Sequence, residues 1–282
     1  MTRRTPAAIR LIAIDVDGTL LDSRGRIPEA NLRAIGEATS RGIQVVVATG
    51  RSFSFALPAV APLADPLLLI VHNGALARQR TGETLLRRLL PRESARVVLE
   101  ATVAWRASTL LYFDRARDGQ IVTDRLDWAH PNRARFRQRN QDIIAEVDAL
   151  EGALTEDPIQ LAFNGELMAM RGVVDALTRH PTAGDLSVSI TEYPQRDFAL
   201  VDVCGPATTK GQTLARVAAA LEIAREDVMA IGDNHNDRDM LEWAGLGVVM
   251  GNAEPELLDS RFERTSANDE AGLAAAIRRW AL

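Results

Sequence analysis

The sequence has little that would form a disulfide, cross a membrane or bind a polyanion. Cys204 is the only cysteine among 282 residues, so no internal disulfide can form and a reducing, cytoplasmic location is expected. No apolar run approaches the ~20 residues that span a bilayer, so no membrane partner is expected. The net charge of −5 gives no reason to expect nucleic acid as a partner. With 46% hydrophobic and 25% charged residues, the chain has the composition of a globular protein.

What the sequence does contain is a repeated alternation of short apolar runs and helical patterns. The first run, LIAI at 11–14, has the continuous apolar character of a strand buried on both faces. A helix is predicted over 29–40, and the same rhythm returns near residue 204 with a helix over 209–221. This order predicts a parallel sheet with right-handed crossovers, and hence an α/β fold. The strands predicted for this parallel sheet are 11–14, 43–48, 67–71, 228–231 and 247–250.

Between the two parts of this pattern the rhythm changes. Strands and helices are mixed there, and several apolar runs could be hairpin strands. We therefore expect two domains: a parallel-sheet unit formed by residues 1–83 and 198–282, and an α+β unit formed by residues 84–197 and inserted into the first.

Polar side chains follow several of the predicted parallel strands at the point where each strand ends. Because the carboxyl ends of parallel strands meet at one edge of a sheet, side chains far apart in the sequence can converge there. A lysine at the start of the helix after residue 208 belongs to the same set. The side chains expected to converge are Asp15, Asp17, Thr49, Lys210, Asp233, Asn236 and Asp237.

These residue types favour phosphoryl chemistry. Three carboxylates in one cleft repel each other, and a hard divalent cation with oxygen ligands, Mg²⁺ rather than zinc, would remove that penalty. A lysine and a hydroxyl beside the cation suggest an anionic substrate such as a phosphoryl group. Asp15 would be the nucleophile and Asp17 the acid/base, with Gly18 permitting the tight turn that keeps the two acids together. The simpler interpretations are a solvated turn for the paired acids and a helix cap for Thr49.

Four segments, in order, resemble the motifs of the haloacid dehalogenase-like (HAD) superfamily phosphohydrolases. DVDGTL at 15–20 is similar to the first motif, ATGR at 48–51 to the second, and TKG at 209–211 to the third. GDNHNDRDM at 232–240 resembles the fourth motif in the form seen in the Cof-type branch. That branch carries a large α+β cap between its second and third motifs. The resemblance therefore implies a Rossmann-like catalytic core and an inserted cap that selects the substrate.

The resemblance also implies residue roles. Asp15 would be the nucleophile and an Mg²⁺ ligand, and Asp17 the acid/base whose backbone carbonyl binds the metal. Asp233 would be a further ligand, and Asp237 would support the metal site. The residues implied to bind phosphate are Thr49, Gly50, Lys210 and Asn236. His235 stands where the family has variable residues, and it is not expected to be a ligand.

The function implied is Mg²⁺-dependent hydrolysis of a small phosphorylated metabolite through an aspartyl-phosphate. Sugar phosphates are the first expectation, with nucleotide or cofactor phosphates after them. Two alternatives stay open at this point. A phosphomutase would use the same acids but release no free phosphate. A metabolite-binding regulator on the same fold would bind a metabolite and have little catalytic activity.

Overall fold

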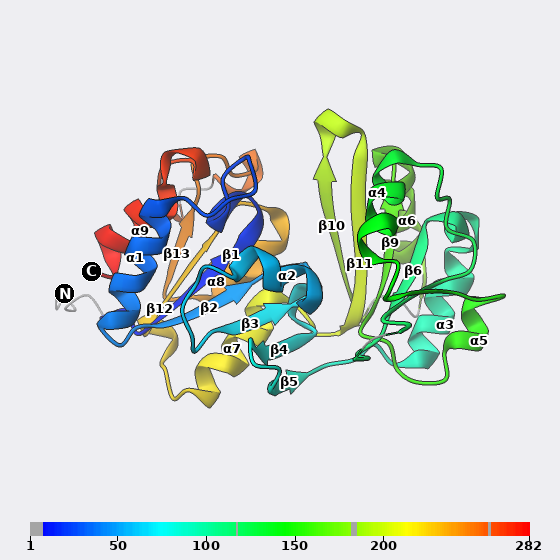
Figure 1. Ribbon diagram of the computed structural model, residues 1–282, viewed down its shortest axis with the longest axis horizontal. Helices are drawn as coiled ribbons and strands as arrows, with labels where there is room; N and C mark the ends of the chain where they lie inside the picture. The colour runs from blue at the N-terminus through cyan, green and yellow to red at the C-terminus, as the bar shows by residue number, and fades with distance from the viewer. Residues whose placement is uncertain (1–7, 117, 182–184, 259–260) are drawn as a thin grey trace. The chain divides into compact units, whose positions relative to one another are not determined.

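The computed structural model describes residues 8–116, 118–181, 185–258 and 261–282, which divide into two compact units (Figure 1). Unit 1 consists of the described residues up to Arg87 together with those from Thr209 onward, and unit 2 runs from Arg88 to Thr208. Within these described ranges, no helix is long and apolar enough to cross a membrane.

Unit 1 is built on a sheet with a parallel centre. Its strands are β1 (Leu11–Asp15), β2 (Gln44–Ala48), β3 (Leu68–Val71), β4 (Leu76–Gln79), β5 (Thr84–Arg87), β12 (Val228–Gly232), β13 (Leu246–Val249) and β14 (Glu263–Arg264). The described strands form an eight-stranded sheet in the order β14-β13-β12-β1-β2-β3-β4-β5. Neighbours from β14 to β3 run parallel, and β4 and β5 are added antiparallel. Each of the five predicted parallel strands is observed, and the α/β fold class is confirmed.

β1 lies between β12 and β2, and every one of its residues is buried. Leu11 and Ala13 share a core with the helices after residue 209, whereas Ile12 and Ile14 alternate to the opposite face and are equally buried. A strand covered on both faces needs apolar side chains at every position, which explains the unbroken run LIAI. Asp15 is the first polar residue of this strand, so it stands at the carboxyl edge of the sheet.

Five helices of unit 1 enclose the sheet in the described part of the chain. They are α1 (Glu29–Ser40), α2 (Phe53–Val60), α7 (Lys210–Ala220), α8 (Arg238–Trp243) and α9 (Gly272–Trp280). Leu214 and Val217 of α7 pack with Met240 and Leu241 of α8 over the sheet. α1 and α9 lie side by side (Figure 1). Short helical turns follow three of the strand ends: η1 (Val16–Leu20), η2 (His72–Gly74) and η6 (His235–Asp237).

Unit 2 has its own sheet and its own core. Its strands are β6 (Thr109–Tyr112), β7 (Ile121–Thr123), β8 (Ile144–Glu146), β9 (Gln160–Gly165), β10 (Leu186–Tyr193) and β11 (Phe198–Pro206), and its helices are α3 (Arg92–Ala101), α4 (Pro131–Asn140), α5 (Leu150–Ala153) and α6 (Leu167–Arg179). The strand order is β10-β11-β9-β6-β7-β8, antiparallel except for β7 with β8. Phe163 and Val201 pack with α3 and α6 in the core. Cys204 is buried in β11, and burial raises the pKa of its thiol.

The limits of the units differ from the expected limits at 84 and 197. β5 pairs with β4 and therefore belongs to the sheet of unit 1. β11 pairs with β9 and β10 and therefore belongs to the sheet of unit 2. Each of these strands is joined to its unit by antiparallel pairing. The pattern of apolar residues indicates that such a segment is a strand, but it does not indicate which sheet the strand joins. The boundaries expected at 83/84 and 197/198 were therefore wrong.

A buried asparagine connects the segment after β1 to two helices. Asn31 of α1 donates a hydrogen bond from Nδ2 to the carbonyl oxygen of Leu20, at 3.1 Å. Its Oδ1 accepts from the backbone N–H of Ala274 in α9, also at 3.1 Å. Both backbone groups are in the interior, so they depend on this side chain for hydrogen bonding.

We expect Asn31→Ala to destabilise unit 1 by about 2 kcal/mol, because it leaves a buried carbonyl and a buried N–H unpaired. Urea unfolding monitored by circular dichroism measures the change. Gln44→Ala, at an exposed position at the start of β2, is the control and should change the free energy of unfolding by less than about 0.5 kcal/mol. Equal stability of the two variants would contradict the assignment.

Candidate functional site

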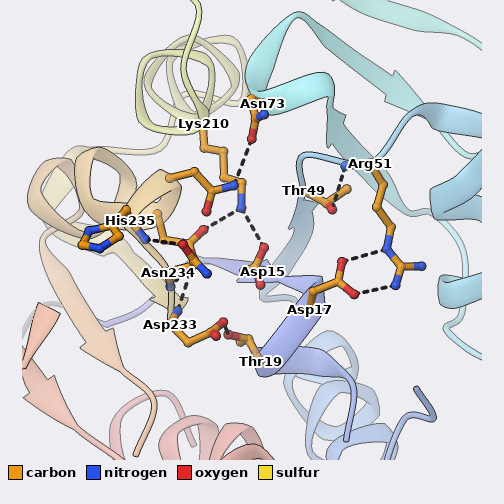
Figure 2. A network of polar contacts seen from close by, with 12 residues as sticks. Asp15, Asp17, Thr19, Thr49, Arg51, Asn73, Lys210, Asp233, Asn234 and His235 are labelled. Carbon is orange, nitrogen blue, oxygen red and sulfur yellow. Dashed lines mark hydrogen bonds and ion pairs between the residues drawn. The ribbon is translucent and has the colours of Figure 1, made fainter. Parts of the chain in front are cut away.

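Three buried carboxylates meet at the carboxyl edge of the unit 1 sheet, and Figure 2 labels two of them, Asp15 and Asp233. Asp15 ends β1, Asp233 follows β12, and Asp237 lies in η6. Their exposed fractions are 5%, 8% and 0%. One oxygen from each lies within 4.8 Å of the others. The described residues therefore contain an oxygen-only donor group that could hold a cation.

Lys210 is the cation inside this cluster. It is the first residue of α7 and only 1% exposed. Its Nζ donates to Asp15 Oδ1 at 2.7 Å and to Asp237 Oδ1 at 2.6 Å. Burial alone would lower the pKa of Lys210, but the charges of Asp15 and Asp237 outweigh burial and raise the pKa above its ordinary value. The lysine is therefore held in its charged form.

One lysine does not neutralise three acids. Burial, followed by repulsion from Asp237, raises the pKa of Asp15 to about 7. Burial and repulsion from Asp15 raise the pKa of Asp233 well above its usual range. These shifts mark a deficit of positive charge within a cluster of oxygen donors, and a hard divalent cation is the group that such a donor set fits.

The turn after β1 is shaped to bring Asp233 close. Gly18 has φ +88°, and a Cβ at this position would lie 2.2 Å from Asp233 Oδ2, so only glycine fits. Thr19 donates from Oγ1 to Asp233 Oδ1 at 2.8 Å. Asn252, which follows β13, donates from Nδ2 to the Gly18 carbonyl at 2.9 Å. The bond from Thr19 holds the first motif against the fourth, and the bond from Asn252 holds it against the segment after β13.

Asp237 also orders the loop that carries Asp233. Its Oδ2 accepts from the backbone N–H groups of Asp233, at 3.1 Å, and of Asn234, at 3.0 Å. A Cβ on Gly232 would lie 2.6 Å from Asp237, so the strand end must be glycine for the carboxylate to fold back. The ring of His235 points away from the acid cluster (Figure 2), and its Nε2 lies 3.7 Å from Glu256 on the exposed surface.

The second motif holds Asp17 away from the acid cluster. Arg51 forms a two-pronged ion pair with it, Nε to Oδ2 at 2.7 Å and Nη2 to Oδ1 at 2.5 Å (Figure 2). The Asp17 side chain is 52% exposed. Thr49, which is buried, accepts from the backbone N–H of Arg51 through Oγ1 at 3.1 Å. The pairing orients the Asp17 carboxylate independently of the buried acids.

The structure thus brings most of the predicted site residues to one edge of unit 1 and separates the Asp17 carboxylate from the rest. Asn236 joins the site through a hydrogen bond from its Nδ2 to Asn73 Oδ1, at 3.0 Å. Asn73 in turn lies against Gly50. Residues whose contacts sequence reasoning missed are Thr19, Arg51, Asn73 and Asn252. A signal existed for two of these, because Asn73 and Asn252 each follow the end of a parallel strand just as Asp233 does.

Comparisons with known proteins indicate the family. A family model described as haloacid dehalogenase-like hydrolase matches residues 12–277. Phosphatase YwpJ of Bacillus subtilis is 30% identical, over 94% of this chain and 98% of its own. The 5-amino-6-(5-phospho-D-ribitylamino)uracil phosphatase YcsE of the same organism is 31% identical, over 99% of both chains. A solved haloacid dehalogenase-like hydrolase from Bacteroides thetaiotaomicron has a TM-score of 0.78 at 26% identity, covering 96% of this chain and 99% of that one.

We expect Mg²⁺ to stabilise the protein more at pH 8 than at pH 5. The folded-state pKa of Asp15, about 7, lies above its ordinary value of 3.8, so without a cation the folded state loses stability as the pH rises through this window. A bound cation offsets that loss, and its ligands must be deprotonated to bind it. At saturating Mg²⁺ the rise in melting temperature over EDTA should be on the order of 5 °C at pH 8 and much smaller at pH 5.

Differential scanning fluorimetry measures both shifts. NaCl at matched ionic strength is the control, because it screens charge without binding specifically. An equal Mg²⁺ effect at the two pH values would show that the raised carboxyl pKa is not linked to cation binding.

Proposed function

The chain belongs to the Cof-type haloacid dehalogenase-like hydrolases, and on that premise we propose that it cleaves its substrates through an aspartyl-phosphate, an acyl phosphate formed on Asp15. The protein is a phosphatase, a phosphoric monoester hydrolase that acts on small phosphorylated metabolites. The observation that carries the proposal is the buried ion pair of Lys210 with Asp15. It directs one carboxylate oxygen of Asp15 to the lysine and leaves Oδ2 for attack on phosphorus.

The proposed reaction has two steps. In the first, Asp15 attacks phosphorus, the bond to the ester oxygen breaks, and Asp17 donates its proton to that leaving oxygen. In the second, Asp17 takes a proton from water while the water attacks phosphorus. The bond between phosphorus and Asp15 then breaks, which releases phosphate and restores the Asp15 carboxylate and the protonated form of Asp17. The half-exposed position of Asp17 supports this role, because the acid/base must reach the leaving group and water.

The remaining site residues are proposed to bind the metal and the phosphoryl group. Asp15, Asp233 and the backbone carbonyl of Asp17 would hold Mg²⁺, with Asp237 supporting Asp233. Bound there, Mg²⁺ would neutralise charge on the phosphoryl oxygens and within the acid cluster. The residues proposed to donate hydrogen bonds or charge to the phosphoryl oxygens are Thr49, Gly50, Lys210 and Asn236.

For the substrate we propose a sugar or sugar-alcohol phosphate first, and a nucleotide or cofactor phosphate second. The related phosphatase YcsE is named for a substrate with a ribityl phosphate joined to a uracil, which combines a sugar-alcohol phosphate with a nucleobase. We further propose that unit 2 selects the leaving group, since all residues of the proposed chemistry come from unit 1. The cytoplasmic location expected from the single cysteine stays a prediction.

The experiment that tests the function is release of inorganic phosphate from a panel of sugar, sugar-alcohol, nucleotide and cofactor phosphates with Mg²⁺. Asp15→Asn should lower kcat by about a thousandfold or more, because it removes the nucleophile. Its melting temperature without metal should not fall, since a buried charge is removed. Asp175→Asn, on the exposed surface of α6, is the matched control. Substantial turnover by Asp15→Asn would exclude the covalent mechanism.

We expect Arg51→Ala to reduce turnover in a way that depends on the leaving group. Without its two hydrogen bonds Asp17 loses its fixed orientation, so alkyl phosphates, whose leaving oxygen needs a proton, should lose about tenfold or more in kcat/KM, which reports the first step alone. p-Nitrophenyl phosphate, whose leaving group needs none, should lose much less. Arg33→Ala, which removes an exposed ion pair with Glu29, serves as the control. Equal losses on the two substrate types would mean that Arg51 does not act through Asp17.

A further inference from the structure

The turn η2 after β3 has an unusual backbone. His72 and Asn73 both have φ +51°, and Gly74 has φ +108°. Residues other than glycine adopt the left-handed region at a cost in free energy, so consecutive examples persist only where the surroundings demand them. All three residues of the turn are buried. The turn directly follows a strand that ends at the same edge of the sheet as β1.

On one side this turn contacts the second motif. The backbone N–H of Asn73 donates to the Thr49 carbonyl at 3.2 Å, and the N–H of His72 donates to the Arg51 carbonyl at 2.9 Å. A Cβ on Gly50 would lie 3.0 Å from Asn73 Oδ1. The backbone around Thr49 is therefore held closely against Asn73, and a Cβ at Gly50 would press on its side-chain amide.

On the other side the turn contacts the third motif. The Gly74 carbonyl accepts from Thr213 Oγ1 at 2.7 Å, and a Cβ on Gly74 would lie 2.3 Å from the Thr209 carbonyl. Thr209 is the cap of α7, the helix that begins with Lys210. The same turn thus sets the start of α7 relative to the loop of Thr49.

The third contact is made by a side chain. Asn73 Oδ1 accepts from Asn236 Nδ2 at 3.0 Å. Glycine would adopt this backbone conformation without cost, so the backbone conformation alone does not explain why residue 73 is asparagine. Asparagine tolerates the left-handed region and adds the carbonyl oxygen that Asn236 uses.

We propose that Asn73 is a positioning residue for the transferred phosphoryl group and acts through Asn236. This inference rests on the proposed function, in which Asn236 contacts a phosphoryl oxygen. A side-chain amide has two N–H donors. Asn73 takes one of them and thereby aims the other at the phosphoryl oxygen. Through the backbone contacts of η2, Asn73 also fixes the positions of Thr49 and Lys210 relative to the N–H of Asn236 that faces the phosphoryl group.

A double-mutant cycle on Asn73 and Asn236 tests the proposal. Asn73→Gly keeps the left-handed backbone and removes only the side chain, so it should fold at least as stably as the natural protein. Asn236→Ala removes the partner. Glu222→Gly is the matched control, since Glu222 has φ +53° at an exposed position after α7 and lies outside the site. Titration calorimetry with inorganic phosphate at saturating Mg²⁺ is the readout, together with kcat and KM.

Asn73→Gly should weaken phosphate binding by about tenfold, Asn236→Ala by a similar factor, and the double variant no further, because both remove the same interaction. Glu222→Gly should bind phosphate as the natural protein does. Losses that multiply in the double variant, or unchanged phosphate affinity in Asn73→Gly, would overturn the proposal. Phosphate binding needs no turnover, so this outcome is independent of whether the phosphate-release panel succeeds.

A second measurement needs no variant of Asn73. In protein labelled with ¹⁵N at asparagine, the side-chain amide signal of Asn236, assigned by its loss in Asn236→Ala, should shift on addition of phosphate. A signal that does not move at saturating phosphate would also overturn the proposal.

Discussion

The site depends on one interaction, the buried ammonium group of Lys210 between Asp15 and Asp237. Asp15 lies 195 residues from the lysine in the sequence, and Asp237 lies 27 residues from it. Each of these charges would be costly to bury without a partner of opposite charge. The ends of β1 and β12 and the first turn of α7 must therefore meet within hydrogen-bonding distance. The parallel order of the sheet achieves this by placing those ends at one edge.

The sequence predicted the parts of this arrangement that depend on local pattern. The strands of unit 1 were predictable because a strand buried on both faces must be apolar throughout, and the acids were predictable because they interrupt such strands at their ends. The contacts between side chains were not predictable from the sequence. That Arg51 turns to Asp17, or that Asn73 accepts from Asn236, depends on φ values and strand register that no local pattern encodes. The limits of the units were missed for a similar reason, since hairpin strands can join either sheet.

The family and the geometry explain different things. Membership in the haloacid dehalogenase-like hydrolases accounts for the reaction type, and relatives near 30% identity leave the substrate open. The geometry explains why particular small residues are needed. Gly18, Gly50, Gly74 and Gly232 stand where another residue's Cβ would meet a site residue. The second motif is thus constrained as much by the side chains packed against it as by the chemistry of Thr49.

The interruption of unit 1 by unit 2 has a consequence for how the protein is made. Synthesis from the N-terminus delivers β1 to β5 first, then every strand of unit 2, and only afterwards α7 and β12. Unit 2 can therefore finish folding on the ribosome while β1 still lacks one neighbour and Asp15 still lacks its lysine. Until the last quarter of the chain emerges, the nascent protein carries an open edge on its central strand. During this interval the Asp15 carboxylate is a solvated group at the end of that unpaired edge.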